Sequence, residues 1–167
     1  MSYGQSLTKQ YLTNIVGPDF IENHRPIWLN GMELDFFYPK HNLAFEFNGD
    51  QHYSPTSMGC PKAQKMRDAR KRAICKGLGV KLISLTAADL LSTKIRMKVK
   101  NAHKCGLLPY YKMTDLDAEC KRYRATLIRS YDSPSARRKS SKPWKAAMAK
   151  AWGKDQPPSD KGAHHLG

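Results

Sequence analysis

The sequence predicts an α/β protein whose mixed central sheet is flanked by helices. Residues 32–38 and 43–52 are apolar, aromatic and β-prone, and the turn-like tetrapeptide between them indicates a hairpin. Apolar residues recur at helix-like intervals over 3–15 and over 62–76, which predicts one helix before the hairpin and one after it. The short apolar run 80–85 is typical of a strand buried on both faces, and we expect it to complete the sheet.

The elements before the hairpin are delimited by Gly and Pro. The helix over 3–15 ends at a Gly-Pro pair and is expected to pack on the sheet. Residues 20–29 are expected to form an edge strand, because Pro26 inside the run cannot donate to a strand ladder. Asn30-Gly31 then turns the chain into the hairpin, so that three strands form an antiparallel meander.

Length and composition restrict the class of protein. A chain of 167 residues suits one domain with an appendage. No apolar run approaches the roughly 20 residues that span a bilayer, and the polar N-terminus lacks the pattern of a signal peptide. We therefore expect a soluble, intracellular protein of the cytoplasm with no membrane partner.

The four cysteines lie far apart with no Cys-x-x-Cys pair. This spacing indicates neither a disulfide framework nor a zinc ribbon, and we expect the thiols to be reduced. The alternative is a structural zinc site, which the spacing does not favour. Such a site would draw its ligands from His52, His103, Cys60, Cys105 and Cys120.

The net charge of +15 is concentrated in the second half of the chain. Residues 1–92 hold 11 Lys and Arg against 8 Asp and Glu, whereas residues 93–167 hold 18 against 6. Such a basic block predicts a polyanion partner, because Lys and Arg displace counterions from phosphates. We expect DNA as the partner, with RNA as a second option; a merely solubilising tail is the alternative.

The composition changes at Thr93. Basic and apolar residues alternate over 93–104, which suits either a strand or a basic arm. Residues 115–129 are expected to form a helix that docks on the rest of the protein through an apolar stripe at helical spacing. The stripe consists of Leu116, Cys120, Tyr123 and Leu127.

Beyond this helix the composition predicts a flexible basic linker over 130–142 and a short helix over 143–152. The predicted organisation is a core over 1–92, a basic and mainly helical nucleic-acid-binding extension over 93–152, and a disordered tail over 153–167.

Two carboxylates in the hairpin predict a site. If the turn occupies 39–42, Tyr38 pairs with Leu43, and counting outward sets Asp35 directly opposite Glu46. Like charges at opposed positions are destabilising. A shared proton would neutralise the pair, but a divalent cation suits it better, because hard ions such as Mg²⁺ take oxygen ligands and often only one or two carboxylates.

The residues after Glu46 extend this site. Side chains alternate along a strand, so Glu46 and Asn48 face the same way, while Phe47 points to the core and leaves its carbonyl available as a ligand. The resulting constellation is an Asp followed by Glu-x-Asn.

Asp35 with Glu46-Phe47-Asn48 resembles the motif of the PD-(D/E)XK nuclease superfamily. The run Glu-Phe-Asn-Gly-Asp-Gln-His-Tyr at 46–53 resembles small phage and bacterial members related to very-short-patch-repair endonucleases, and Lys65-x-Arg67-Asp68-x-x-Lys71 and the run at 79–83 are similar to the helix and strand that follow there. The resemblance covers roughly the first ninety residues.

The resemblance implies a restriction-endonuclease-like core over 1–92 that hydrolyses phosphodiester bonds of DNA. Asp35, Glu46 and the carbonyl of Phe47 would hold Mg²⁺ or Mn²⁺, which activates water and offsets charge in the transition state. If a phage encodes the protein, the host cytoplasm is its compartment.

Two positions depart from the family. The superfamily usually has Lys where this chain has Asn48, and an amide carries no charge. Relatives often have Ser-x-Gly-Glu near the N-terminus, where this chain has Gln5. Glu22 is either a substitute for that Glu or an ordinary exposed strand residue.

Three further side chains are candidates for catalysis. Gln51 and His52 lie close enough in sequence to compensate for Asn48, and His52, as an imidazole with an ordinary pKa of about 6.5, would act as general base or general acid. Asp68 would orient His52 or act as an outer-sphere ligand. The alternative for Asp68 is an exposed helix carboxylate paired to Lys71 or Arg72.

The helix over 62–76 has a largely basic surface, and we expect it to contact DNA. Its inward face is expected to hold Met66, Ala69, Ala73 and Ile74. The expected nucleic-acid contacts are Lys65, Arg67, Lys71, Arg137, Arg138, Lys139, Lys142 and Lys145.

The function expected from the sequence is a metal-dependent DNA endonuclease, with nicking and homing-like activity as the forms considered. One alternative is a nucleic-acid-binding module on a catalytically decayed nuclease scaffold. Another is a structure-specific junction nuclease or an RNA nuclease.

Overall fold

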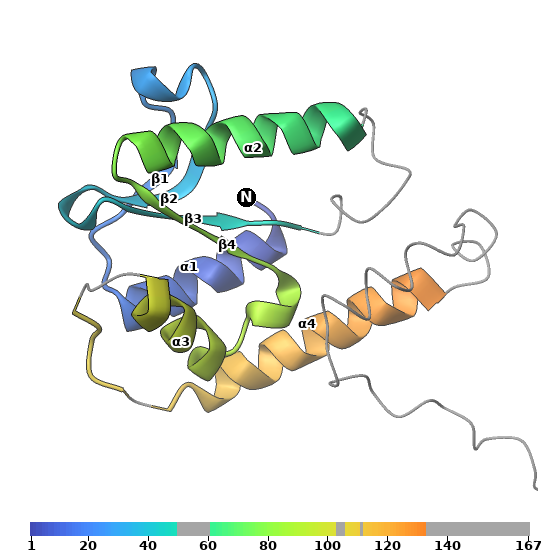
Figure 1. The fold of residues 1–167 in the computed structure, drawn as a ribbon. Helices are drawn as coiled ribbons and strands as arrows, with labels where there is room; N and C mark the ends of the chain where they lie inside the picture. The colour runs from blue at the N-terminus through green and yellow to red at the C-terminus, as the bar shows by residue number, and fades with distance from the viewer. Residues whose placement is uncertain (50–60, 103–105, 111, 133–167) are drawn as a thin grey trace, which may run out of the picture.

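The computed structural model describes residues 1–49, 61–102, 106–110 and 112–132 (Figure 1). The elements are α1 (Tyr3–Ile15), β1 (Ile21–His24), η1 (Ile27–Leu29), β2 (Leu34–Tyr38), η2 (Pro39–His41), β3 (Leu43–Phe47), α2 (Pro61–Gly77), β4 (Lys81–Leu85), η4 (Ala87–Asp89), α3 (Ser92–Ala102) and α4 (Thr114–Asp132).

The sheet has four strands in the order β1-β2-β3-β4. The first three strands are antiparallel neighbours, and β4 joins β3 in parallel. The predicted α/β class, mixed sheet and antiparallel meander are therefore confirmed. The parallel connection from β3 to β4 passes through α2, as expected for parallel neighbours.

Helices cover both faces of the sheet (Figure 1). The face away from α2 packs on α1, α3 and α4 around a large apolar cluster that includes Leu7, Phe45, Ile95 and Cys120. On the other face a smaller cluster, with Phe37, Ala44 and Cys75, lies between the sheet and α2. The two clusters hold β2 and β3 in the middle of the protein.

The predicted first helix is confirmed as α1. Ser2 caps it, and a capping box links the Ser2 and Gln5 side chains to each other's backbone N–H groups. The expected apolar face is fully buried at Leu7, Tyr11 and Ile15. Tyr3, at the end of this face, is 52% exposed.

The predicted strand over 20–29 is shorter than expected. Only Ile21–His24 is a strand, and it lies at the edge of the sheet, as Pro26 required. Pro26 instead precedes the 3-10 helix η1, which ends where Asn30 adopts a left-handed conformation with φ 53°.

The last strand, β4, completes the sheet and packs on both faces, as predicted. Ile83 and Leu85 belong to the large apolar cluster, and Leu82 packs partly buried against the smaller cluster on the other face. β4 is the other edge strand of the sheet, and Lys81 at its start is exposed. The Lys98 ammonium of α3 donates to the Ser84 carbonyl at 3.1 Å, which partly covers this edge.

The segment 93–104, for which the sequence allowed a strand or a basic arm, is helical over the described residues, where it forms α3 (Ser92–Ala102). Ile95 and Val99 are both fully buried, because positions i and i+4 lie on one face of a helix. Alternating apolar residues are two apart, so every second one is also four apart. The same pattern therefore fits a strand and one face of a helix.

The predicted helix over 115–129 is confirmed as α4, and its apolar stripe docks on the large cluster. Cys120 is fully buried, and Leu116, Tyr123 and Leu127 pack partly buried beside it. The boundary at residue 92 stays a prediction; the linker, the short helix and the tail expected after α4 lie outside the described residues. Among the helices of the described segments, none has the length and apolar character to cross a membrane.

Candidate active site

The hairpin has the predicted register. Tyr38 pairs with Leu43 and Phe36 with Phe45, so the next step along the ladder sets Asp35 opposite Glu46. Asp35 Oδ2 accepts a hydrogen bond of 2.8 Å from the backbone N–H of Phe47. The Asp35 carboxylate is thus fixed against the strand that carries Glu46.

Both carboxylates belong to the face of the sheet that α2 covers. Their neighbours Phe36 and Phe45 lie in the large apolar cluster on the opposite face. Side chains alternate along a strand, so Asp35 and Glu46 point to the side of α2.

Helix α2 turns a different face to the sheet than predicted. Met66 is 72% exposed, and Ala69 and Ala73 are also exposed. The partly or fully buried positions are Asp68, Lys71, Ile74 and Cys75. The spacing of Asp68, Lys71 and Cys75 forms one helical row, but apolar periodicity could not find it because two of its members are charged.

Lys71 is the residue of this row that reaches the carboxylates. Its ammonium forms an ion pair with Glu46 Oε1 and donates to the Glu33 carbonyl at 2.7 Å. Both side chains of the ion pair are only 13% exposed. The sequence placed Lys71 among the nucleic-acid contacts, whereas the structure makes it the partner of a site carboxylate.

The site retains negative charge despite Lys71. Burial raises the pKa of Glu46, and the ion pair with Lys71 opposes this effect without overcoming it. The charges of Asp35 and Asp68 raise the Glu46 pKa further. These mutual effects gather Asp35, Glu46, Asp68 and Lys71 into one electrostatic unit, which we name the carboxylate cluster.

Cys75 closes the cluster on its apolar side. It is fully buried, and burial together with the negative charge of Glu46 raises the pKa of its thiol. Cys75 is therefore a packing residue, since reactive cysteines need a lowered pKa. Cys75 and Cys120 are both free thiols.

The two departures from the family motif have structural roles. The backbone N–H of Asn48 donates to the Leu85 carbonyl at 2.7 Å, which holds the end of β3 against β4. The Gln5 side chain accepts from the Ser2 N–H at 2.7 Å within the capping box. The Asn48 bond is made by the backbone, so any residue except Pro could form it, whereas the Gln5 bond uses the side-chain amide oxygen.

Glu22 does not take the place of the missing Glu. It pairs with Phe36 across β1 and β2 and forms a 2.6 Å ion pair with Lys9 of α1. Glu22 thus lies on the α1 face of the sheet, opposite to the face of the carboxylate cluster.

The remaining predicted site residues fall into two groups. Lys65 and Arg67 are exposed on α2. Outside the described residues lie the catalytic candidates Gln51 and His52, the zinc candidates Cys60, His103 and Cys105, and the basic residues Arg137, Arg138, Lys139, Lys142 and Lys145. Within the described segments, no group of three or more His, Cys, Asp or Glu side chains is arranged to hold a metal ion.

Comparison with known proteins reveals a viral relative. No protein-family model matches the chain, and no solved structure matches it. The "Uncharacterized protein 033L" of Invertebrate iridescent virus 3 is 37% identical over 80 residues. The match covers 45% of this chain and 40% of the viral protein, so the chain spans less than half of that relative, whose name states no activity.

Proposed function

We propose that the protein is a metal-dependent nuclease with a restriction-endonuclease-like core that hydrolyses DNA. The observation that supports this proposal is the carboxylate cluster, in which Asp35 and Glu46 stand opposite each other under α2 beside the ammonium of Lys71. Paired carboxylates with a nearby Lys are the groups that phosphodiester hydrolysis needs.

The donor set fits a hard divalent cation. Asp35 and Glu46 offer carboxylate oxygens from adjacent strands, and the carbonyl of Phe47, whose N–H binds Asp35, would be the third oxygen. Burial raises the pKa of Glu46, and the charges of Asp35 and Asp68 raise it further; a cation bound beside Glu46 would favour its ionised form. Asp35, Glu46 and Phe47 would hold Mg²⁺ or Mn²⁺, with Asp68 near enough to act electrostatically.

When bound, the metal ion would polarise the scissile phosphate and lower the pKa of a bound water. Lys71 supplies the fixed charge that Asn48 lacks. Its ammonium is held by the Glu33 carbonyl at 2.7 Å, so it keeps its place beside Glu46 and can donate to a phosphate oxygen that enters the cluster. α2 thus provides the cation that the family usually has on the strand.

The test is cleavage of supercoiled plasmid with Mg²⁺. We expect the parent protein to nick or cut the plasmid, and Asp35→Asn, Glu46→Gln and Lys71→Met to lose at least about 100-fold in rate. The matched control is Glu22→Gln, a carboxylate on the other face of the same sheet, which should cleave like the parent. Cleavage that persists in Asp35→Asn and Glu46→Gln would exclude the proposal.

A second candidate is a nucleic-acid-binding module on a decayed nuclease scaffold. Gln5 in a capping box and Asn48 in place of Lys favour it, because neither supplies the usual charge. Calorimetry with Mg²⁺ and Mn²⁺ separates the two candidates. Salt-sensitive DNA binding without any metal binding would favour the binding module.

A junction nuclease or an RNA nuclease would use the same site. These two candidates differ from the DNA nuclease only in which substrate is cut fastest.

A further inference from the structure

Helix α2 presents unpaired cations to solvent along two flanks, with Lys65, Arg72 and Lys76 on one flank and Arg67 and Arg70 on the other. Their side chains are exposed, and within the described part of the chain none of them forms a hydrogen bond or an ion pair. We call this surface the α2 ridge; it consists of Lys65, Arg67, Arg70, Arg72 and Lys76.

Three cations of α3 have partners within the protein, whereas Lys121, Arg122 and Arg129 of α4 are exposed like the cations of the ridge. On α3, Lys94 donates to the Ala88 carbonyl, Arg96 to the Leu108 carbonyl, and Lys98 pairs with Asp89. These side chains hold the helix to its surroundings. The cations of the α2 ridge have no such internal task.

The ridge destabilises its own helix. Arg67 and Arg70 are three residues apart and Arg72 and Lys76 four apart, and like charges at these spacings repel on a helix surface. Asp68 is the single acidic residue of Pro61–Gly77, and it lies on the inward row of the helix. The repulsion is therefore not balanced on the exposed side, and a bound polyanion would relieve it.

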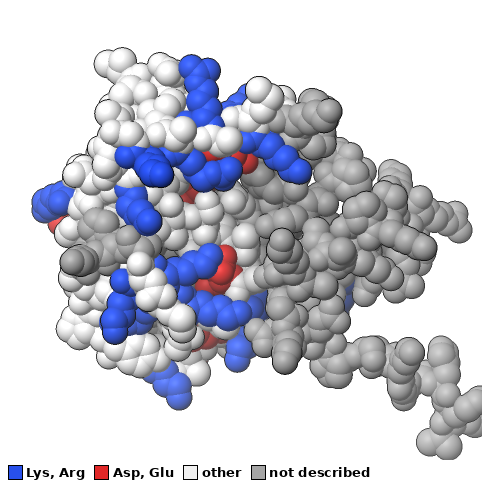
Figure 2. All heavy atoms as spheres, viewed as in Figure 1, with Lys and Arg blue, Asp and Glu red and all other residues white. Residues whose placement is uncertain are grey.

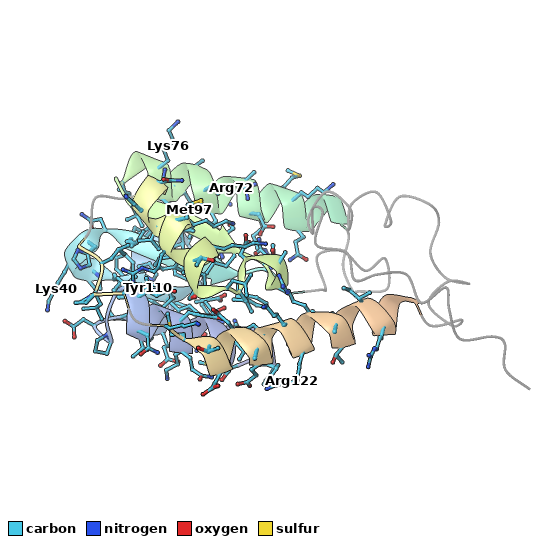
Figure 3. The ribbon with its side chains drawn as sticks, turned by 90° about the horizontal axis from the view of Figure 1, so that it is seen from below. Lys40, Arg72, Lys76, Met97, Tyr110 and Arg122 are labelled. Carbon is cyan, nitrogen blue, oxygen red and sulfur yellow. The ribbon has the colours of Figure 1, made fainter. Side chains whose placement is uncertain are left out.

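The ridge begins beside the carboxylate cluster. Arg67 lies one helical turn, about 6 Å, before Lys71 on the same helix. In Figure 2, Lys and Arg side chains form a band over α2, with carboxylates along its lower border. Figure 3 shows Arg72 and Lys76 on α2, and Arg122 on α4 at the opposite side of the molecule.

We infer that the α2 ridge binds the sugar-phosphate backbone of a nucleic acid. From Lys65 to Lys76 the ridge extends about 16 Å, which corresponds to about five steps of a duplex strand. The backbone lies along the flank of Lys65, Arg72 and Lys76, and Arg67 lies on the other flank, nearer to Lys71 of the carboxylate cluster. This inference adds a substrate-binding surface to the proposed function, but the binding itself does not require cleavage.

The test measures duplex DNA binding in EDTA, where metal-dependent cleavage cannot occur. Fluorescence anisotropy over a series of salt concentrations gives the affinity and its salt slope. The ridge variant is Lys65→Gln/Arg72→Gln/Lys76→Gln. The matched control is Lys121→Gln/Arg122→Gln/Arg129→Gln, which removes the same charge from exposed positions of α4.

We expect the ridge variant to flatten the slope of log affinity against log salt by about 2.7, which is the contribution of three phosphate contacts on duplex DNA. The control should change the slope by less than about 1. Equal effects of both variants would overturn the inference, because they would show a response to net charge alone. Tighter binding of polyglutamate than of DNA would also overturn it, in favour of an acidic protein partner.

Two further measurements separate a loss of DNA binding from a loss of folding, and this inference from the proposed function. Far-UV circular dichroism and urea midpoints check that both triple variants fold; if the ridge variant does not, Arg72→Gln and Lys76→Gln are used singly, each with an expected slope change of about 0.9. Glu22→Gln, on the opposite face of the sheet, should bind DNA like the parent. If the plasmid is not cleaved but ridge binding holds, the proposed function fails and this inference stands.

Discussion

The Lys71 ammonium joins α2 to two strands of the sheet at once. It pairs with Glu46 Oε1 on β3 and donates at 2.7 Å to the carbonyl of Glu33, which directly precedes β2. The distance from β2 to β3 and the height of α2 above them are thus coupled through one side chain. Lys71 therefore has a proposed role in catalysis and a role in holding the fold together. Its loss should lower both the cleavage rate and the free energy of unfolding.

The first prediction concerns stability. Lys71→Met should lower the free energy of unfolding by about 3 kcal/mol, because it leaves Glu46 buried without its counterion. Urea denaturation measures the change. Arg72→Gln, on the next residue but exposed, should stay within about 0.5 kcal/mol of the parent.

The double variant Lys71→Met/Glu46→Gln checks the mechanism of this loss. Because it removes both charges, it should be more stable than Lys71→Met alone. If the double variant is the less stable of the two, the ion pair does not account for the loss.

The second prediction is a pH dependence of stability. The folded protein holds the Glu46 proton more tightly than the unfolded chain, because burial raises the Glu46 pKa above its ordinary value of 4.5. This contribution to stability is complete below pH 4.5 and is lost as the pH rises through the raised pKa. The Glu46→Gln variant cannot lose this contribution, because an amide does not titrate.

Urea unfolding of the parent and of Glu46→Gln over a pH series measures this effect. The variant should gain stability relative to the parent as the pH rises above 4.5 and level off at higher pH. A relative stability that falls over the same range would contradict the raised pKa.

The third prediction links metal to protons. A cation beside Glu46 stabilises the ionised carboxylate, so Mg²⁺ binding should release protons at pH values near and below the raised pKa of Glu46. Calorimetric titrations in two buffers of different ionisation enthalpy measure the release. Glu46→Gln should bind Mg²⁺ more weakly and release fewer protons. If this variant releases as many protons as the parent, the protons come from a group other than Glu46.

The fourth prediction concerns a polar network that joins α1, α3 and α4. The Asp117 carboxylate accepts from the Tyr11 hydroxyl at 2.5 Å, and from the Ser92 N–H and hydroxyl at 2.9 and 2.8 Å. Asp117→Ala leaves these mostly buried donors unsatisfied and should cost about 3 kcal/mol in urea unfolding. Asp115→Ala, which removes an exposed carboxylate from the same first turn, should cost less than about 1 kcal/mol.

The fifth prediction tests the contact between α1 and β3. A Cβ at Gly4 would overlap the Phe47 ring, so Gly4→Ala should destabilise by about 1 to 3 kcal/mol. It should also weaken Mg²⁺ binding, because the Phe47 N–H fixes Asp35. In the control Gly77→Ala, the new Cβ meets no atom within 4 Å, and we expect parental metal affinity with a stability change of less than about 1 kcal/mol.

The sequence predicted those features that depend on interactions between residues close together in the chain. The extent of α1, the register of Tyr38 with Leu43 and the apolar stripe of α4 were all predicted, because capping, turn length and helical spacing act over a few residues. Asp35 and Glu46 are opposed for the same reason, since the register follows from the turn.

Only the tertiary structure decided what the charged residues contact. Apolar spacing in α2 predicted Met66 inward, but the sheet face below it carries Glu46, which draws Lys71 inward and leaves Met66 exposed. Similarly, Glu22 faces α1 because of its place in the sheet. Burying Lys71 is favourable only beside a carboxylate, and that carboxylate lies 25 residues away in sequence. The sequence by itself thus determined the pair of carboxylates, and the fold decided which cation pairs with Glu46.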